Sequence, residues 1–207
     1  FVYLSTVKVL GEASDLRAFT DQDRPAPAEA YSESKLRAEE ALKQEAGGME
    51  TVILRPPVVH GPGARGNMER LMRTIRKGRP LPVGRITARR SLLGVDHLAE
   101  AVRLAVTERR AAGGRFLVRD DEDPTLPDLV RRLGRALGCK PRIVPVPVGA
   151  MRTAGRLTGR EAGIARITSS LVVDDSPFRE TTGYRPVVDL DTGLARMARW
   201  FRAQQMR

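Results

Sequence analysis

Short runs of aliphatic and β-branched residues recur along this chain, and a segment with helical character follows most of them. Runs at 1–4, 51–54, 91–95 and 116–118 are predicted strands, and 143–148 is predicted to be an edge strand or extended segment. Predicted helices cover 30–45, 67–77, 96–108 and 126–137, and most of 151–207 outside a loop at 174–189; residues 11–28 form a predicted loop. Alternation of apolar strands with helices favours a largely parallel sheet. The sequence therefore predicts an α/β fold.

Residue preferences at the helix ends predict where individual helices start and stop. Asn67 and Asp96 are predicted N-caps, because their side-chain oxygens can accept a hydrogen bond from the first helical turn. Gly47 and Gly138 follow helices and are predicted to end them. His97 comes directly after its predicted cap, so we expect its side chain to face solvent.

Composition excludes several classes of protein. Among 207 residues there are one cysteine and two histidines, which leaves no disulfide framework and no thiolate or histidine cluster for a metal. No apolar run has the length of a membrane-spanning helix, and a single cysteine fits a reducing compartment, so we expect a cytoplasmic protein with no membrane partner. The net charge is +11, but the basic residues are spread along the chain and aromatics make up only 4%, which favours a solvated surface over nucleic-acid binding.

A tyrosine and a lysine lie four residues apart on the strongest predicted helix. Tyr31 and Lys35 therefore share one face of that helix, one turn apart. An ammonium group near a phenol favours the phenolate, and a phenol tuned in this way can exchange a proton with a hydroxyl or carbonyl oxygen of a substrate. The pair alone is a weak signal, because exposed helical pairs of this kind are common.

The position of this pair in the predicted sheet strengthens the signal. Ser5 and Thr6 end the first predicted strand, and Pro56 and Pro57 end the next one. The carboxyl ends of parallel strands meet at one edge of the sheet, which is where open α/β folds place their ligands. We therefore expect the Thr6 hydroxyl and the Tyr31 phenol to act on the same substrate oxygen.

These motifs resemble the nucleotide-sugar epimerase/dehydratase family of the extended short-chain dehydrogenase/reductases, in particular its UDP-galactose 4-epimerase-like members. Matching segments follow one another in order over nearly the whole chain, at 1–6 with 11–12, 31–35, 54–63, 89–99, 174–176 and 183–186. The resemblance implies that residues 1–62 form the C-terminal part of a Rossmann-type doubly wound parallel sheet that binds NAD. Residues 63–207 would form a smaller α/β substrate-binding lobe, with 91–119 returning to the Rossmann sheet.

The resemblance also assigns roles to residues at the predicted sheet edge. Thr6 falls at the catalytic Ser/Thr position of the family and Tyr31 at its catalytic acid/base. Lys35 falls at the third catalytic position, which binds the nicotinamide ribose. Tyr31, Lys35 and Pro57 are the implied contacts to the cofactor, NAD or NADP.

The same resemblance implies a nucleotide-sugar substrate. Ser5, Asn67 and Arg90 are the implied substrate contacts, and a guanidinium such as that of Arg90 can meet diphosphate oxygens bidentately. The implied activity is that of an NAD-dependent 4-epimerase for a UDP-hexose or UDP-N-acetylhexosamine, working by transient hydride transfer through a 4-keto intermediate. A nucleotide-4-keto-sugar reductase uses the same residues and is an alternative, and so is a noncatalytic binding protein on this scaffold.

Two departures from the family pattern qualify these expectations. The glycine-rich fingerprint that binds the pyrophosphate of NAD is absent, so we expect the chain to begin partway through the cofactor domain and to bind NAD poorly by itself. A homodimer is accordingly expected only for the complete protein. Family members that act as 4,6-dehydratases carry an acidic pair after the catalytic threonine, whereas Val7 and Lys8 stand there, which disfavours dehydration.

Overall fold

The computed structural model describes residues 1–14 and 17–205 and forms two compact units. Unit 1 comprises Phe1–Val59, Ser91–Asp121 and Leu171–Val188, and unit 2 comprises His60–Arg90, Glu122–Ser170 and Asp189–Arg207. Residues 171–188, which are expected in the substrate-binding lobe, belong to unit 1 in the structure. The reason is packing, because Phe178 and Tyr184 are buried in the same cluster as Phe116.

Unit 1 is built on a parallel sheet of three short strands. In the order of the sheet these are β1 (Val2–Leu4), β2 (Val52–Arg55) and β5 (Arg115–Leu117). Leu4 lies beside Leu54, and Leu54 lies beside Phe116, so the three strands end at the same edge. The sheet confirms the predicted α/β fold with parallel strands.

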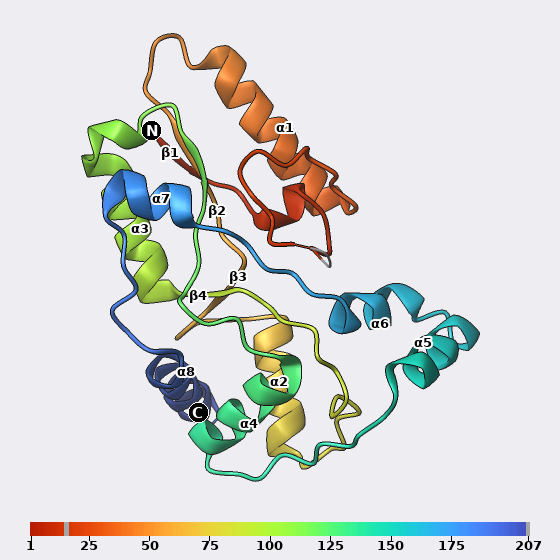
Figure 1. Ribbon diagram of the computed structural model, residues 1–207. Coiled ribbons are helices and arrows are strands. Elements are labelled where there is room, and N and C mark those ends of the chain that lie inside the picture. The colour runs from red at the N-terminus through yellow and green to blue at the C-terminus, as the bar shows by residue number, and fades with distance from the viewer. Residues whose placement is uncertain (15–16, 206–207) are drawn as a thin grey trace. The chain divides into compact units, whose positions relative to one another are not determined.

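Helices cover the two faces of this sheet, as Figure 1 shows, with α1 on one side and α3 and α7 on the other. The elements of unit 1 are α1 (Ala30–Glu45), α3 (Val95–Thr107), α7 (Ser176–Thr182), and the short 3-10 helices η1 (Val7–Val9) and η2 (Arg109–Ala111). Side chains alternate between the faces of a strand, so Leu54 and Phe116 enter the core beneath α3 while Arg55 points toward α1. The face beneath α3 is therefore apolar, whereas the face toward α1 combines the buried Arg55 with an apolar cluster that contains Val7 and Leu117.

Two further short strands, β3 (Val58–His60) and β4 (Leu92–Gly94), pair with each other in a separate sheet. Unit 2 is helical and contains α2 (Asn67–Arg76), α4 (Leu126–Leu137), α5 (Val148–Leu157), α6 (Glu161–Thr168) and α8 (Leu190–Gln204). Helix α4 packs against both α2 and α8, and α5 packs against α6. Of the predicted segment 143–148, residues 143–147 lie outside helices and strands apart from one isolated bridge from Ile143 to Leu81, and Val148 begins α5.

Two predicted N-caps are wrong by one or two residues. Gly66, whose φ is 69°, caps α2, and Asn67 is the first residue of that helix. Helix α3 starts at Val95 after Gly94, which leaves Asp96 inside the first turn. The prediction considered only side-chain oxygens, whereas a glycine can adopt the left-handed conformation that Gly66 needs.

The predicted loop at 174–189 contains a helix, α7. This helix has only seven residues and carries Pro177 in its first turn, so its sequence has no visible helical period. Its stability comes from packing of the fully buried Phe178. The predicted loop at 11–28 includes residues 15–16, and the predicted helical end of the chain includes 206–207, which lie outside the described residues.

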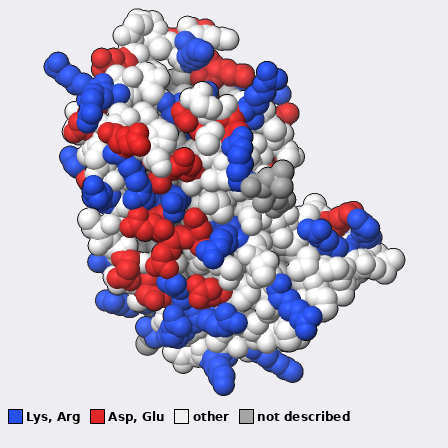
Figure 2. Space-filling view, in the orientation of Figure 1, with Lys and Arg blue, Asp and Glu red and all other residues white. Residues whose placement is uncertain are grey.

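The two units differ strongly in charge. Unit 2 has 22 Lys and Arg against 7 Asp and Glu, a net charge of +15, whereas unit 1 has 14 against 18, a net charge of −4. On the face drawn in Figure 2, basic side chains gather over the lower part, where Figure 1 places α2, α4 and α8. No helix in the described part of the chain is both long and apolar enough to cross a membrane.

Candidate active site

The carboxyl ends of β1 and β2 lie side by side, and their pairing continues beyond the strands. The Ser5 amide donates to the carbonyl of Leu54 at 2.8 Å, and the Val7 amide donates to the carbonyl of Pro56 at 3.0 Å. Thr6, between them, is 8% exposed, and its hydroxyl oxygen accepts a hydrogen bond from the Lys8 amide at 3.3 Å. The structure thus brings Thr6 to the edge of the sheet where Pro56 and Pro57 follow the next strand.

Two polar contacts attach the first half of α1 to this edge. The Lys35 ammonium donates to the carbonyl oxygen of Leu4 at 2.9 Å and lies 4.9 Å from the centre of the Tyr3 ring. The Lys8 ammonium, on η1, lies 2.8 Å from a carboxylate oxygen of Glu29, the N-cap residue of α1. Lys35 is therefore bonded to the short stretch of backbone that carries Thr6.

The Tyr31 side chain, in the first turn of α1, is 54% exposed. Within the described residues its phenol oxygen makes no hydrogen bond to another protein group. Tyr31 and Lys35 are one turn apart on the same helix. The structure therefore holds Lys35 in place and leaves the phenol open to a small molecule.

Behind these residues lies a buried charged group that the sequence analysis did not identify. Arg55 is fully buried and binds the 4%-exposed Glu39 with two nitrogens, Nε to Oε1 at 3.0 Å and Nη2 to Oε2 at 2.5 Å. The Ser5 hydroxyl donates to Oε1 of the same carboxylate. Two signals were available: Glu39 continues the helical spacing of Tyr31 and Lys35, and Arg55 places a charge at the end of an apolar strand.

The three residues expected to contact substrate have different surroundings. Ser5 belongs to unit 1, is 4% exposed and directs its hydroxyl to Glu39. Asn67 and Arg90 belong to unit 2. Asn67 is exposed and accepts a hydrogen bond from Arg70 at 3.3 Å, and the half-buried Arg90 donates to the carbonyl of Ser169 at 3.1 Å.

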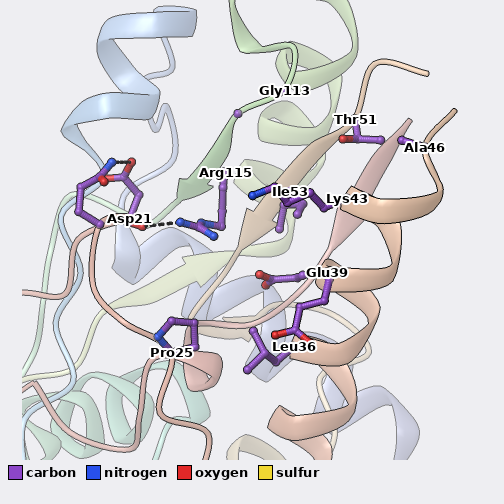
Figure 3. Close-up of a pocket in the computed structure, with 13 residues that line it drawn as sticks. Asp21, Pro25, Leu36, Glu39, Lys43, Ala46, Thr51, Ile53, Gly113 and Arg115 are labelled. Atoms are coloured by element: carbon purple, nitrogen blue, oxygen red, sulfur yellow. Dashed lines mark hydrogen bonds between the residues drawn. The ribbon is translucent and has the colours of Figure 1, made fainter. Parts of the chain in front are cut away.

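A cavity of about 580 Å³ lies between the second half of α1 and the strands β2 and β5 (Figure 3). Its charged lining comprises Asp21, Glu39, Glu40, Lys43 and Arg115. The Arg115 guanidinium donates to the carbonyl of Asp21 at 3.1 Å. Neither Thr6 nor Tyr31 lines this cavity, and Glu39 is the lining residue that also bonds Ser5 and Arg55.

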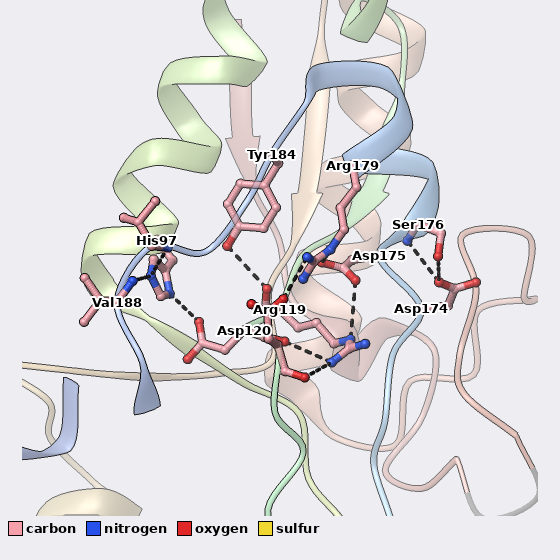
Figure 4. A network of polar contacts seen from close by, with 11 residues as sticks. His97, Arg119, Asp120, Asp174, Asp175, Ser176, Arg179, Tyr184 and Val188 are labelled. Carbon is pink, nitrogen blue, oxygen red and sulfur yellow. Dashed lines mark hydrogen bonds and ion pairs between the residues drawn. The ribbon is translucent and has the colours of Figure 1, made fainter. Parts of the chain in front are cut away.

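His97 is buried, which corrects the expectation that it faces solvent. Its Nδ1 lies 2.6 Å from a carboxylate oxygen of Asp120, and its Nε2 accepts from the amides of Val187 at 3.2 Å and Val188 at 3.0 Å (Figure 4). Because Nε2 is an acceptor, the hydrogen must be on Nδ1, and it is donated to Asp120. His97 thus connects α3 to the segment after α7.

A cluster of charges holds α7 beside the end of β5, as Figure 4 also shows. Arg179 donates to Asp175 at 2.7 Å and to Asp121 at 2.8 Å, and Arg119 lies 3.4 Å from Asp175. Burial raises the pKa of the Asp175 carboxyl, an effect that Arg179 and Arg119 oppose. Burial, followed by the nearby Asp120, raises the pKa of the Tyr184 phenol. These contacts account for the place of residues 171–188 in unit 1.

Sequence comparison identifies relatives of this chain. The family model described as "NAD dependent epimerase/dehydratase family" matches residues 1–118. The chain is 37% identical over 205 residues to a UDP-glucose 4-epimerase from Vibrio cholerae, covering 97% of the chain and 62% of that protein. The chain therefore spans less than two thirds of the length of this curated relative.

Solved structures share the fold. A UDP-glucuronic acid 4-epimerase from Bacillus cereus, in complex with NAD, matches with a TM-score of 0.79 and 21% identity, over 99% of this chain and 61% of its own. The protein RMD from Pseudomonas aeruginosa, complexed with NADPH, matches with a TM-score of 0.75 and 19% identity, over 98% and 66%. With the family model covering more than half of the sequence, the chain belongs to the NAD-dependent epimerase/dehydratase family.

Proposed function

We propose that the complete protein is an NAD-dependent nucleotide-sugar 4-epimerase that acts on a UDP-hexose or UDP-N-acetylhexosamine. The observation that carries this proposal is the hydrogen bond from Lys35 to the carbonyl of Leu4, two residues before Thr6. The exposed Tyr31 lies one turn before Lys35 on α1. The name of the Vibrio relative supports the choice of an epimerase.

The residues at the sheet edge suit the nicotinamide ribose of the cofactor. Ribose hydroxyls need hydrogen-bond partners, and the ammonium of Lys35 has three hydrogens, one of which is donated to Leu4. Pro57 follows β2 at the same edge, and we assign it, with Tyr31 and Lys35, to the cofactor contact. NAD, when bound, supplies a reversible hydride acceptor for C4 of the sugar.

The protein side chains handle the proton of the reaction. The Tyr31 phenolate takes the proton of the sugar 4-hydroxyl while C4 loses hydride, which leaves a C4 carbonyl and a neutral phenol. Thr6 donates a hydrogen bond to the same oxygen. The 4-keto sugar, whose C4 is planar, then rotates in the site and presents its other face. C4 receives hydride on that face, and Tyr31 returns the proton to the oxygen.

Charge supports a nucleotide diphosphate as the anchor of the substrate. Unit 2 carries a net charge of +15 and contains Asn67 and Arg90, which we assign to the diphosphate. Ser5 is retained as a proposed contact beside Thr6. Dehydration is not part of the proposal, because Val7 and Lys8 follow Thr6 and neither can act as a carboxylate base. A cytoplasmic homodimer is the proposed state of the complete protein.

The full-length protein that contains this chain provides the test. Purified protein is mixed with UDP-hexoses, and epimer formation is followed together with NADH absorbance at 340 nm. The proposal expects epimer without a net change in NADH. A stoichiometric change in NADH would instead support the alternative 4-keto-sugar reductase, and no turnover of any kind would support a binding protein.

The variant Tyr31→Phe tests the proton transfer directly. Loss of the phenol hydroxyl should lower kcat by about 10²–10⁴-fold, the usual contribution of a general acid/base. Ser34→Ala, which changes an exposed hydroxyl in the same turn of α1, is the matched control and should keep full activity. Tyr31→Phe with a kcat close to that of the unaltered protein would contradict the assignment.

A further inference from the structure

Helix α1, which carries Tyr31 and Lys35, has a weak apolar anchor: Leu36 packs, only partly buried, against the cluster that contains Val7 and Leu117. The buried residues of this 16-residue helix are Ser32 and Glu39. A helix normally docks through an apolar stripe, which fixes its depth against a sheet. Directional polar contacts therefore supplement Leu36 in fixing its position, and the bidentate pair of Glu39 with the fully buried Arg55 is the most geometrically restrictive of them.

The carboxylate of Glu39 also contacts the strand that carries Thr6. The Ser5 hydroxyl donates to Oε1 of Glu39, and Thr6 is the next residue. Arg55 belongs to β2, so one carboxylate ties α1 to the ends of both neighbouring strands. The third nitrogen of Arg55, Nη1, has no hydrogen-bond partner in the described part of the chain, which leaves Glu39 as the anchor of this guanidinium.

The geometry of α1 makes the phenol sensitive to this anchor. Tyr31, Lys35 and Glu39 are spaced by four residues and lie along one stripe of the helix. Eight residues separate Glu39 from Tyr31, a rise of about 12 Å, so a tilt of about 5° at Glu39 moves Tyr31 by about 1 Å. A misplacement of about 1 Å can cost about 10²-fold in rate.

We propose that Glu39 and Arg55 are positioning residues that set the geometry between Tyr31 and Thr6. The proposal rests on the proposed function for its kinetic consequence, but its structural consequence is independent of it. The proposed role requires no contact of either residue with substrate or cofactor. Their effect is transmitted through α1 to Tyr31 and through Ser5 to Thr6.

The double variant Glu39→Leu with Arg55→Met, made in the full-length protein, separates position from stability. Replacing both members of a buried ion pair by apolar residues of similar volume is often neutral or stabilising, so the fold should persist with a thermal midpoint within about 3 °C. The directional contact is lost, so kcat should fall by about 30-fold or more while KM stays within about 3-fold. The matched control removes the exposed ion pair of the same helix, through Glu33→Gln with Arg37→Gln, and should leave both constants unchanged.

A structural readout distinguishes failure of this inference from failure of the proposed function. The crystal structure of the double variant should show Tyr31 displaced relative to Thr6, and amide hydrogen exchange over 30–36 should be faster. If the unaltered protein has no turnover, the proposed function fails, and these two measurements still decide the inference. A folded double variant with Tyr31 in place and kcat within about 3-fold of the unaltered protein would overturn it.

If the double variant does not fold, Arg55→Lys replaces it. Lysine keeps the buried charge and loses the bidentate geometry, so we expect kcat to fall by about 10-fold with exchange over 30–36 raised. Unchanged kcat and unchanged exchange in a folded Arg55→Lys variant would likewise overturn the inference. A purely structural role of the pair would lower stability without moving kcat in the protein that remains folded.

Discussion

Replacing His97 with leucine removes three hydrogen bonds that the ring makes inside unit 1. Nδ1 lies 2.6 Å from Asp120, and Nε2 accepts from the amides of Val187 and Val188. Leucine fills a similar volume but can neither donate nor accept. The free energy of unfolding should fall because polar groups near α3 lose their partners without gaining water in equal measure.

The size of the loss follows from the burial of each partner. Asp120 is 4% exposed and loses the hydrogen bond from His97, although it still accepts one from the Gly94 amide at 2.9 Å. A hydrogen bond to a charged group contributes about 1.5–3 kcal/mol. Val188 is half-buried, and its amide adds about 1 kcal/mol. Val187 is 86% exposed, so water can replace the ring at its amide. The sum is about 2.5–4 kcal/mol, a large fraction of the stability of a typical domain.

Urea denaturation of the His97→Leu variant measures this loss, and amide hydrogen exchange at Val188 reports it locally. Val106→Ala, which truncates a 69%-exposed side chain on the same helix, is the control and should change stability by less than about 0.5 kcal/mol. A buried His97 ring and a solvent-facing one predict different losses of stability. A solvent-facing ring predicts a loss as small as that of the control, and a loss below about 1 kcal/mol would refute the network described above.

Two further predictions concern the buried Tyr184 of unit 1 and the helix-ending Gly138 of unit 2. Burial raises the pKa of the Tyr184 phenol, so its neutral form stabilises the fold below the ordinary tyrosine pKa of about 10, and that stability is lost as the pH rises above it. Absorbance at 295 nm should show a tyrosine ionisation above the ordinary range, and Tyr184→Phe should abolish that step. Gly138 ends α4 with a φ of 72°, and an added Cβ would meet no atom there, so Gly138→Ala should cost about 1 kcal/mol of unfolding free energy from backbone conformation alone. Gly149→Ala, in the first turn of α5 with equal space and an ordinary φ, should not destabilise the fold.

The sequence predicts those elements whose signals are local. Helix α1 occupies the predicted residues 30–45, because a long run of good helix formers ends at Gly47, and α4 occupies 126–137 for a similar reason. Helix α7 was missed because its seven residues are stabilised by Phe178 and its neighbours in the core rather than by propensity. The burial of His97 likewise depends on Asp120, which is 23 residues away in the sequence.

The candidate site also combines features with local sequence signals and a contact between residues distant in the sequence. Thr6, Tyr31 and Lys35 stay predicted site residues; their positions, after a strand and along one face of a helix, could be predicted because strand ends and helical spacing are visible in the sequence. The pairing of Glu39 with Arg55 could not, since it joins residues 16 apart across a helix and a strand. The charge of Arg55 at the end of an apolar strand is visible in the sequence, but its partner Glu39 becomes evident only from the fold.

The uneven charge of the two units has a kinetic consequence. A body with a net charge of +15 accelerates the diffusional arrival of polyvalent anions, and mobile ions remove this acceleration as their concentration rises. Association rates measured for an anionic ligand of this protein should therefore decline steeply with added potassium chloride, while dissociation changes little. Constants obtained in dilute buffer would overstate how quickly such a ligand is captured in a cell.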